Sequence, residues 1–148
     1  MQRQQGFSLI EVLITMLIVS IGLLGIAGII VTNLKHNQSS YARTQASLLV
    51  SDIVDRMRAN RAAAETAPSP YQLASGAAPD AAAGVAGADL AQWRSALAAA
   101  IPSGTGSVSI DPVTNNVTVV VQWDDSRASG DGRTMGLATQ KISVETHL

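Results

Sequence analysis

The chain of 148 residues has no cysteine, few aromatic side chains and no excess of basic charge. Without cysteine it has no disulfide, no thiol nucleophile and no cysteine ligand for zinc. Aromatic residues make up 3% of the chain, which leaves few side chains on which single-stranded bases can stack. The formal net charge of −1 argues against the basic stripe that is typical of nucleic-acid binders. We therefore expect no nucleic acid among its partners.

Residues that catalyse reactions or bind metals are also sparse. His36 and His147 are the only histidines, and they lack the spacing of metal ligands. No serine lies in a nucleophile-elbow motif, and the glycine-rich segments lack the lysine of a phosphate-binding loop. Asp124, Asp125 and Asp131 share one expected loop but not EF-hand spacing, so we interpret them as solvated carboxylates. We expect no enzyme activity, no catalytic residue, no metal site and no cofactor.

Charge is absent from a long stretch near the N-terminus. No charged residue occurs between Glu11 and Lys35, which leaves 23 mostly apolar residues at positions 12–34. A helix of that length spans roughly 34 Å, enough to cross the hydrocarbon core of a bilayer. A secretory signal peptide has a shorter apolar region followed by small residues at a cleavage site. We therefore expect a transmembrane helix that is retained.

A short polar leader precedes this stretch: residues 1–6 read Met-Gln-Arg-Gln-Gln-Gly, and Phe7 follows. Glu11 lies at the edge of the apolar stretch, where a carboxylate needs a partner or must reach water. The leader, the glycine, Phe7 and a glutamate four residues later resemble a type IV prepilin processing site. The resemblance implies that prepilin peptidase cuts between Gly6 and Phe7 and methylates the new N-terminus at Phe7. It also implies that Glu11 pairs with the N-terminal ammonium of a neighbouring subunit.

Three glycines, Gly22, Gly25 and Gly28, lie inside the apolar stretch. Small residues at this spacing allow helices to approach closely in a membrane. Each glycine also lowers helix stability by about 1 kcal/mol relative to alanine. Pilins often carry a helix-breaking proline in this segment, whereas this chain has no proline before Pro68. The glycines therefore have two interpretations, close packing and local helix flexibility.

The helix is expected to continue beyond the apolar stretch. Neither glycine nor proline occurs between Val31 and Ala67, which favours one helix of about sixty residues that ends before Pro68. Asp52 and Arg56 have the spacing of an exposed ion pair on this helix. Apolar residues recur every three or four positions and predict one buried stripe: Ala42, Ala46, Leu49, Ile53 and Met57.

Two runs in this second half, residues 37–46 and 52–61, resemble PilV-type minor pilins of the type IV pilus. Those low-abundance subunits help to start pilus assembly and promote the display of pili. The resemblance covers roughly residues 1–61. Arg56, Arg58 and Arg61 form either a solvated face or a contact with neighbouring minor pilins.

The remaining chain predicts a small domain. Residues 66–88 read as a loop, and Asp89 is expected to cap a short helix that buries Leu90, Trp93, Leu97 and Ala100 or Ile101. Alternating apolar residues predict strands around residues 108–110, 117–123 and 142–144, with a mobile loop at 124–136. We expect an antiparallel sheet that buries its apolar face on the helix stripe. The expected fold is therefore α+β and pilin-like, with a long N-terminal helix whose first half is transmembrane.

The expected division is a leader peptide at 1–6, a transmembrane and filament-core half at 7–34, an amphipathic half at 35–66 and a periplasmic domain at 67–148. The resemblance implies a minor pilin in the bacterial inner membrane, a single-pass protein that acts in pilus priming, surface display, twitching motility and adhesion. It implies as partners other minor and major pilins, prepilin peptidase, the inner-membrane assembly platform and membrane lipid. The alternatives are a minor pseudopilin of type II secretion and a bitopic membrane-anchored binding protein.

Overall fold

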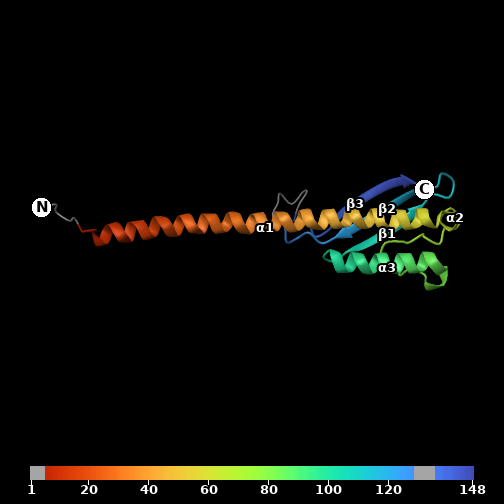
Figure 1. The fold of residues 1–148 in the computed structure, drawn as a ribbon, viewed down its shortest axis with the longest axis horizontal. Helices are drawn as coiled ribbons and strands as arrows, with labels where there is room; N and C mark the ends of the chain where they lie inside the picture. The colour runs from red at the N-terminus through yellow and green to blue at the C-terminus, as the bar shows by residue number, and fades with distance from the viewer. Residues whose placement is uncertain (1–5, 129–135) are drawn as a thin grey trace.

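The computed structural model of the protein describes residues 6–128 and 136–148. A long N-terminal apolar helix, α1 (Leu9–Ala59), packs through its second half against a small antiparallel sheet, as Figure 1 shows. The first half of α1 extends alone from the head domain, which is built around the second half. The expected pilin-like α+β fold is confirmed. The leader residues 1–5 and part of the loop expected at 124–136, including Asp131, lie outside the described residues.

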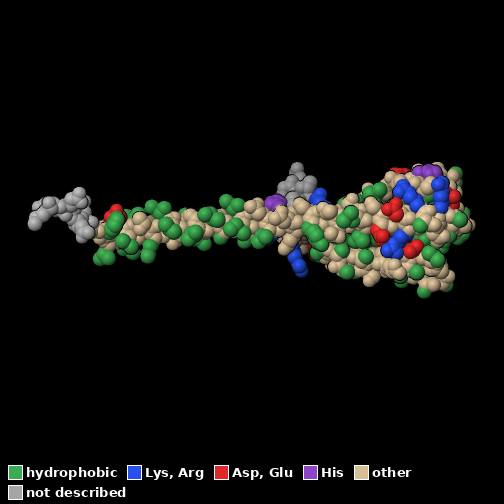
Figure 2. Space-filling view, viewed as in Figure 1, with side chains coloured by type: hydrophobic (Ala, Val, Ile, Leu, Met, Phe, Trp, Pro, Cys, Tyr) green, Lys and Arg blue, Asp and Glu red, His purple; other side chains and the backbone are tan. Residues whose placement is uncertain are grey.

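The exposed half of α1 carries the apolar side chains, whereas charged side chains gather over the head (Figure 2). α1 is long and apolar enough to cross a membrane, and its most apolar stretch is not buried by any other part of the described protein. A stretch with this composition finds an apolar environment only in lipid or against other helices.

The second half of α1 forms one wall of the core, and its first buried residue is Ser39. Four members of the predicted stripe are buried, while Leu49 is only half-buried. Val50 and Val54, which were not part of the predicted stripe, are buried as well. Since α1 contacts a second helix and two strands, its buried face is wider than one stripe.

The expectation of one continuous helix to residue 66 is wrong, because α1 ends at Ala59. Asn60 leaves the helical region with φ −115° and ψ 40°, and a short helix α2 (Arg61–Ala64) follows. The Asn60 Nδ2 donates to the Tyr71 hydroxyl oxygen at 3.2 Å. Asparagine is favoured at helix ends because its side chain forms such alternative hydrogen bonds. The break therefore turns the chain back toward Tyr71.

The second helix begins earlier than expected. A 3-10 turn, η1 (Ala81–Ala83), leads directly into α3 (Gly84–Ala100), so Asp89 lies inside the helix and does not cap it. Asp80 caps this region instead, since its carboxylate accepts the Ala82 N–H at 2.8 Å. The expected buried face of α3 is confirmed; of the two alternatives at its end, Ala100 is only half-buried, while Ile101, the non-helical C-cap, is buried.

The described residues form one three-stranded sheet in the order β1-β2-β3, with β1 (Thr105–Ile110), β2 (Asn116–Trp123) and β3 (Gln140–His147). Both pairings are antiparallel; Val119 of β2 lies opposite one valine in each neighbouring strand. The predicted alternation is confirmed, since every second residue of β2 is buried: Val117, Val119, Val121 and Trp123.

The sheet packs on two helices rather than on the α1 stripe alone. α1 contacts β2 and β3, while α3 lies beside α1 and contacts β1. Trp93 of α3 connects the three layers: its indole N–H donates to the Leu49 carbonyl oxygen at 2.8 Å, and its ring lies against Gly106 of β1. A Cβ at Gly106 would overlap this ring, so the strand needs glycine there. The expectation that the helix stripe alone covers the sheet is therefore incomplete.

The segment expected to be a plain loop also contributes to the core. Tyr71 and Leu73 are both buried, and Leu73 forms an isolated antiparallel bridge with Val108 of β1. The two backbone N–H···O bonds of this bridge are each 2.9 Å long. They cover part of one edge of the sheet, which removes unpaired backbone groups from water and from other chains.

Candidate functional site

The expected processing position lies immediately before α1. Gly6, Phe7 and Ser8 are non-helical and exposed, and Phe7 has 84% of its surface accessible. Ser8 is the N-cap of α1: its backbone is extended, and its hydroxyl oxygen accepts the Ile10 N–H at 3.3 Å. The bond between Gly6 and Phe7 therefore lies in exposed backbone outside the helix.

Glu11 is in the first turn of α1 and is exposed. Its backbone N–H donates to the Ser8 carbonyl oxygen at 3.1 Å. Ser8 and Glu11 have the S-x-x-E spacing of a capping box, a signal that the sequence reasoning did not use. A carboxylate in this turn is favoured by the positive end of the helix dipole. The position of Glu11 in the first turn thus favours the start of α1 through the helix dipole, independently of any role between subunits.

Gly22, Gly25 and Gly28 all lie within the unbroken helix α1. A Cβ added at any of them would meet nothing within 4 Å. The polar side chain of Thr32 is satisfied within the helix, since its hydroxyl donates to the Gly28 carbonyl oxygen at 3.0 Å. The folded chain by itself therefore does not require glycine at these positions.

The three arginines near the end of α1 have partners within the chain. Arg58 pairs with Asp55 at 3.3 Å and donates to the Thr146 hydroxyl at 3.2 Å. Arg61 pairs with Glu65 at 2.6 Å. Arg56 contacts residues of α3 in addition to Asp52, so it forms more than the exposed i,i+4 ion pair that its spacing predicted.

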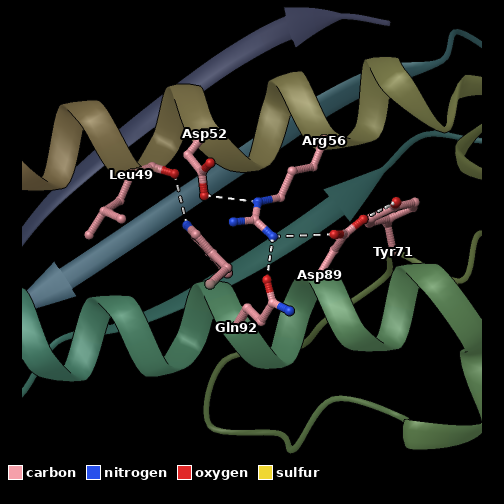
Figure 3. Close-up of polar contacts among 7 residues, drawn as sticks. Leu49, Asp52, Arg56, Tyr71, Asp89 and Gln92 are labelled. Carbon is pink, nitrogen blue, oxygen red and sulfur yellow. Dashed lines mark hydrogen bonds and ion pairs between the residues drawn. The ribbon is translucent and has the colours of Figure 1, made fainter.

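Arg56 links α1 to α3 (Figure 3). Its Nε donates to Asp52 at 3.0 Å, and its Nη1 donates to Asp89 at 3.3 Å and to Gln92 at 2.9 Å. Hydrogen bonding to the Asp52 carboxylate raises the pKa of Arg56 above its ordinary value, with Asp89 acting in the same direction. The charged guanidinium therefore links α1 to α3 through these three hydrogen bonds.

Tyr71 extends this network into the segment before η1. Its hydroxyl donates to the second Asp89 oxygen at 2.7 Å, so Asp89 accepts from both Tyr71 and Arg56. Burial raises the pKa of Tyr71, and the hydrogen bond to Asp89 raises it further. We call this network the α1–α3 clamp; its members are Asp52, Arg56, Asn60, Tyr71, Asp89 and Gln92. The sequence reasoning missed the clamp because it assigned Asp89 to a helix cap.

A second long-range contact lies where α1 enters the head. The Ser39 hydroxyl donates to Asp125 Oδ2 at 2.8 Å, and Asp125 is only 6% exposed. The interpretation of Asp125 as a solvated carboxylate is therefore wrong. Its neighbour Asp124 accepts the Ser126 N–H at 2.9 Å, and this bond holds the pKa of Asp124 below its usual range. Within residues 6–128 and 136–148, no three His, Asp or Glu residues group as a metal site would require.

Comparison with known protein families supports the interpretation of the N-terminal segment as a prepilin-like motif. Residues 1–27 match the family described as the prokaryotic N-terminal methylation motif. Searches of curated proteins and of solved structures gave no match. The match supports a type IV pilin-like or pseudopilin protein, and a single N-terminal apolar helix behind such a motif fits anchoring in the inner membrane. The chain therefore carries a prokaryotic N-terminal methylation motif at the start of a pilin-like α+β fold.

Proposed function

We propose that the chain is a minor pilin that takes part in type IV pilus assembly, in priming and in the surface display of pili. The observation that carries the proposal is the methylation motif at residues 1–27, which includes the start of the apolar helix α1, together with a head of pilin-like fold. The PilV-type assignment rests on the residue runs 37–46 and 52–61. Twitching motility and adhesion are the processes in which such a subunit acts.

In this proposal prepilin peptidase removes residues 1–6, and Phe7 becomes the methylated first residue. Residues 7–34 hold the subunit in the inner membrane and later lie in the filament core, while residues 35–66 carry the periplasmic head at 67–148. The partners are other minor and major pilins, the inner-membrane assembly platform and membrane lipid. The function is structural, so neither catalysis nor a cofactor is needed.

Glu11 determines which subunits insert into the growing filament. The ammonium of a neighbouring subunit's processed N-terminus is its partner in a medium of low dielectric constant. Breaking such a pair by removing one member costs about 3–5 kcal/mol, because the other charge is left buried. Insertion of a subunit with its Glu11 unpaired is therefore strongly disfavoured. The glycines at positions 22, 25 and 28 allow either close helix packing or local loosening during this step.

The first test is the mass of the N-terminal peptide, measured from membranes with and without prepilin peptidase. We expect a methylated peptide that begins at Phe7 and that disappears when the peptidase is deleted. An intact Met1 start in both strains would contradict the proposal and would favour a bitopic membrane-anchored binding protein.

The second test concerns Glu11 and separates pairing from helix capping. Glu11→Gln keeps an oxygen acceptor in the first turn but removes the charge, whereas Ser8→Ala removes the observed N-cap and keeps the charge. We expect Glu11→Gln to reduce recovery of the subunit in sheared pili at least tenfold, since the lost ion pair exceeds 1.4 kcal/mol. Ser8→Ala should have a smaller effect. Equal recovery of Glu11→Gln and unmodified subunits would refute the pairing role.

A minor pseudopilin of type II secretion is the second candidate, because it would use the same processing motif and the same kind of helix. Deletion of the gene separates the two machines. Loss of surface pili and twitching with secretion intact supports the pilus, and loss of secretion with pili intact supports the pseudopilus.

A further inference from the structure

A groove with a cavity volume of about 570 Å³ lies where the exposed half of α1 meets the head. α1 contributes one wall, and the head contributes the other through Pro102, Asp124, Asp125, Arg127 and Ala128. The lining combines apolar groups with both signs of charge, and the members that matter here are Leu34, Gln38, Tyr41, Asp124 and Arg127. Leu34 and Tyr41 are both largely exposed, so the groove is accessible in the folded chain.

The groove begins where the apolar stretch of α1 ends. Leu34 is the last residue of that stretch, and Tyr41 lies about 10 Å further along the helix at about 1.5 Å per residue. A bilayer has a hydrocarbon core of about 30 Å within a total of about 40–45 Å, so each headgroup layer is roughly 5–7 Å thick. With Leu34 at the edge of the hydrocarbon, the groove therefore extends through the headgroup layer, and Tyr41 lies a few ångströms beyond it at about the aqueous rim.

The charges of the groove select among headgroups. Asp124 is ionised at neutral pH, as an aspartate ordinarily is, and the Ser126 N–H and the positive charge of Arg127 hold its pKa further below its usual value. Asp125 also lines the groove, but its Oδ2 already accepts from the Ser39 hydroxyl, so Asp124 is the carboxylate and Arg127 the guanidinium that face a ligand. A phosphate with an attached primary ammonium complements both groups, whereas an anionic headgroup without an amine would be repelled by Asp124.

We propose that this groove binds the headgroup of an amine-bearing zwitterionic phospholipid, with the phosphate toward Arg127 and the ammonium toward Asp124. The acyl chains leave past Leu34 into the hydrocarbon. The proposal rests on the membrane anchoring in the proposed function. It assigns lipid recognition to the base of the head, in addition to the anchoring by the helix itself.

The experiment uses the full chain in vesicles that contain equal amounts of phosphatidylethanolamine and phosphatidylglycerol. A benzophenone amino acid replaces Tyr41 in the groove or, as the control, Ser40, which is exposed but does not line the groove. The two positions differ by about 1.5 Å along the helix and about 100° around it. After illumination, the mass of each adduct identifies the captured molecule.

At position 41 we expect ethanolamine-lipid adducts to exceed glycerol-lipid adducts by about 2- to 5-fold, the range for one solvent-exposed ion pair. At position 40 the ratio should follow the bulk composition. Combined Asp124→Asn and Arg127→Gln substitution should abolish the preference, and asparagine keeps an acceptor for the Ser126 N–H. Lys141→Gln, on exposed β3, is the matched control and should leave the preference unchanged.

Four other outcomes would overturn the groove proposal. Flotation of the vesicles reports anchoring separately: a chain that floats but gives the bulk ratio at position 41 overturns the groove proposal alone. A preference that survives the combined variant also overturns it. Adducts to a second copy of the chain overturn it by making the groove a subunit contact. A chain that does not float with the vesicles overturns the anchoring and the groove proposal together.

Discussion

Asp89 is the residue on which the α1–α3 clamp depends most. Its carboxylate accepts from the Tyr71 hydroxyl at 2.7 Å and from Arg56 at 3.3 Å. A hydrogen bond from a buried hydroxyl to an ionised group contributes about 1.5–3 kcal/mol. The ion pair contributes less, about 0.5–1 kcal/mol, because the side chains of Arg56 and Asp89 are 31% and 18% exposed. Asp89→Ala should therefore lower the free energy of unfolding by about 2–4 kcal/mol.

The assay is urea unfolding of the full chain in detergent micelles, followed by fluorescence of the two tryptophans, both of which are buried in the head. Asp89→Asn keeps an acceptor for Tyr71 and should cost less than Asp89→Ala. Asp55→Ala removes a carboxylate from a largely exposed pair and should change stability by less than about 0.5 kcal/mol.

A double-mutant cycle tests the reasoning directly. Tyr71→Phe and Asp89→Ala should be less destabilising together than the sum of the single changes, by about 1–2 kcal/mol, because they remove the same hydrogen bond. Strict additivity, or a loss for Asp89→Ala no larger than that for Asp55→Ala, would refute the clamp as a stabilising unit.

The pH dependence of the clamp follows from Tyr71. Its pKa is raised above the ordinary value of 10.0, so folding favours the neutral phenol. This stabilisation is complete below about pH 10 and is lost as the pH rises through the folded-state pKa. In a Tyr41→Phe protein, tyrosinate absorbance reports Tyr71 alone, since the chain has two tyrosines. A transition at or below pH 10 in the folded protein would contradict the burial argument.

Three further predictions concern packing. Ser39→Ala leaves the buried carboxylate of Asp125 without its hydroxyl donor and should cost about 1–3 kcal/mol in urea unfolding, whereas no measurable loss would exclude the contact. Gly106→Ala should cost about 1–3 kcal/mol by displacing the Trp93 ring and should shift near-ultraviolet circular dichroism; an unchanged spectrum would contradict the packing. Replacing all three glycines of the apolar half by alanine should leave head stability unchanged, because a Cβ at each meets open space. Normal pilus incorporation of that triple variant would remove the proposed flexibility role, whereas the close-packing role would stand because alanine is still small enough for close helix approach.

The parts of the fold that the sequence could predict are those whose signals are local. β2 has buried residues at every second position over Asn116–Trp123, and the apolar stretch of α1 is defined by composition alone. The expected processing position depends on a few neighbouring residues around Gly6 and Phe7. These features require no knowledge of which distant segments meet.

The features that the sequence could not predict depend on distant partners. Asn60 ends α1 beside Tyr71, and Asp89 serves Tyr71 and Arg56 instead of capping a helix. Asp125 is buried because it meets a residue 86 positions earlier in the chain. In each case a polar residue that is typical of loops or helix caps forms a hydrogen bond with a distant part of the chain instead of a local one. Such tertiary contacts override the local preference of the residue.

The unbroken course of α1 fixes the direction in which the head faces. The helix turns about 100° and rises about 1.5 Å per residue, and no break separates Glu11 from the first buried residue, Ser39. One residue inserted between Leu34 and Ser39 would therefore rotate the whole head about 100° relative to Glu11 while raising it by only about 1.5 Å. The number of residues in this connecting stretch thus sets the azimuth at which a subunit presents its head around any helical bundle that it joins.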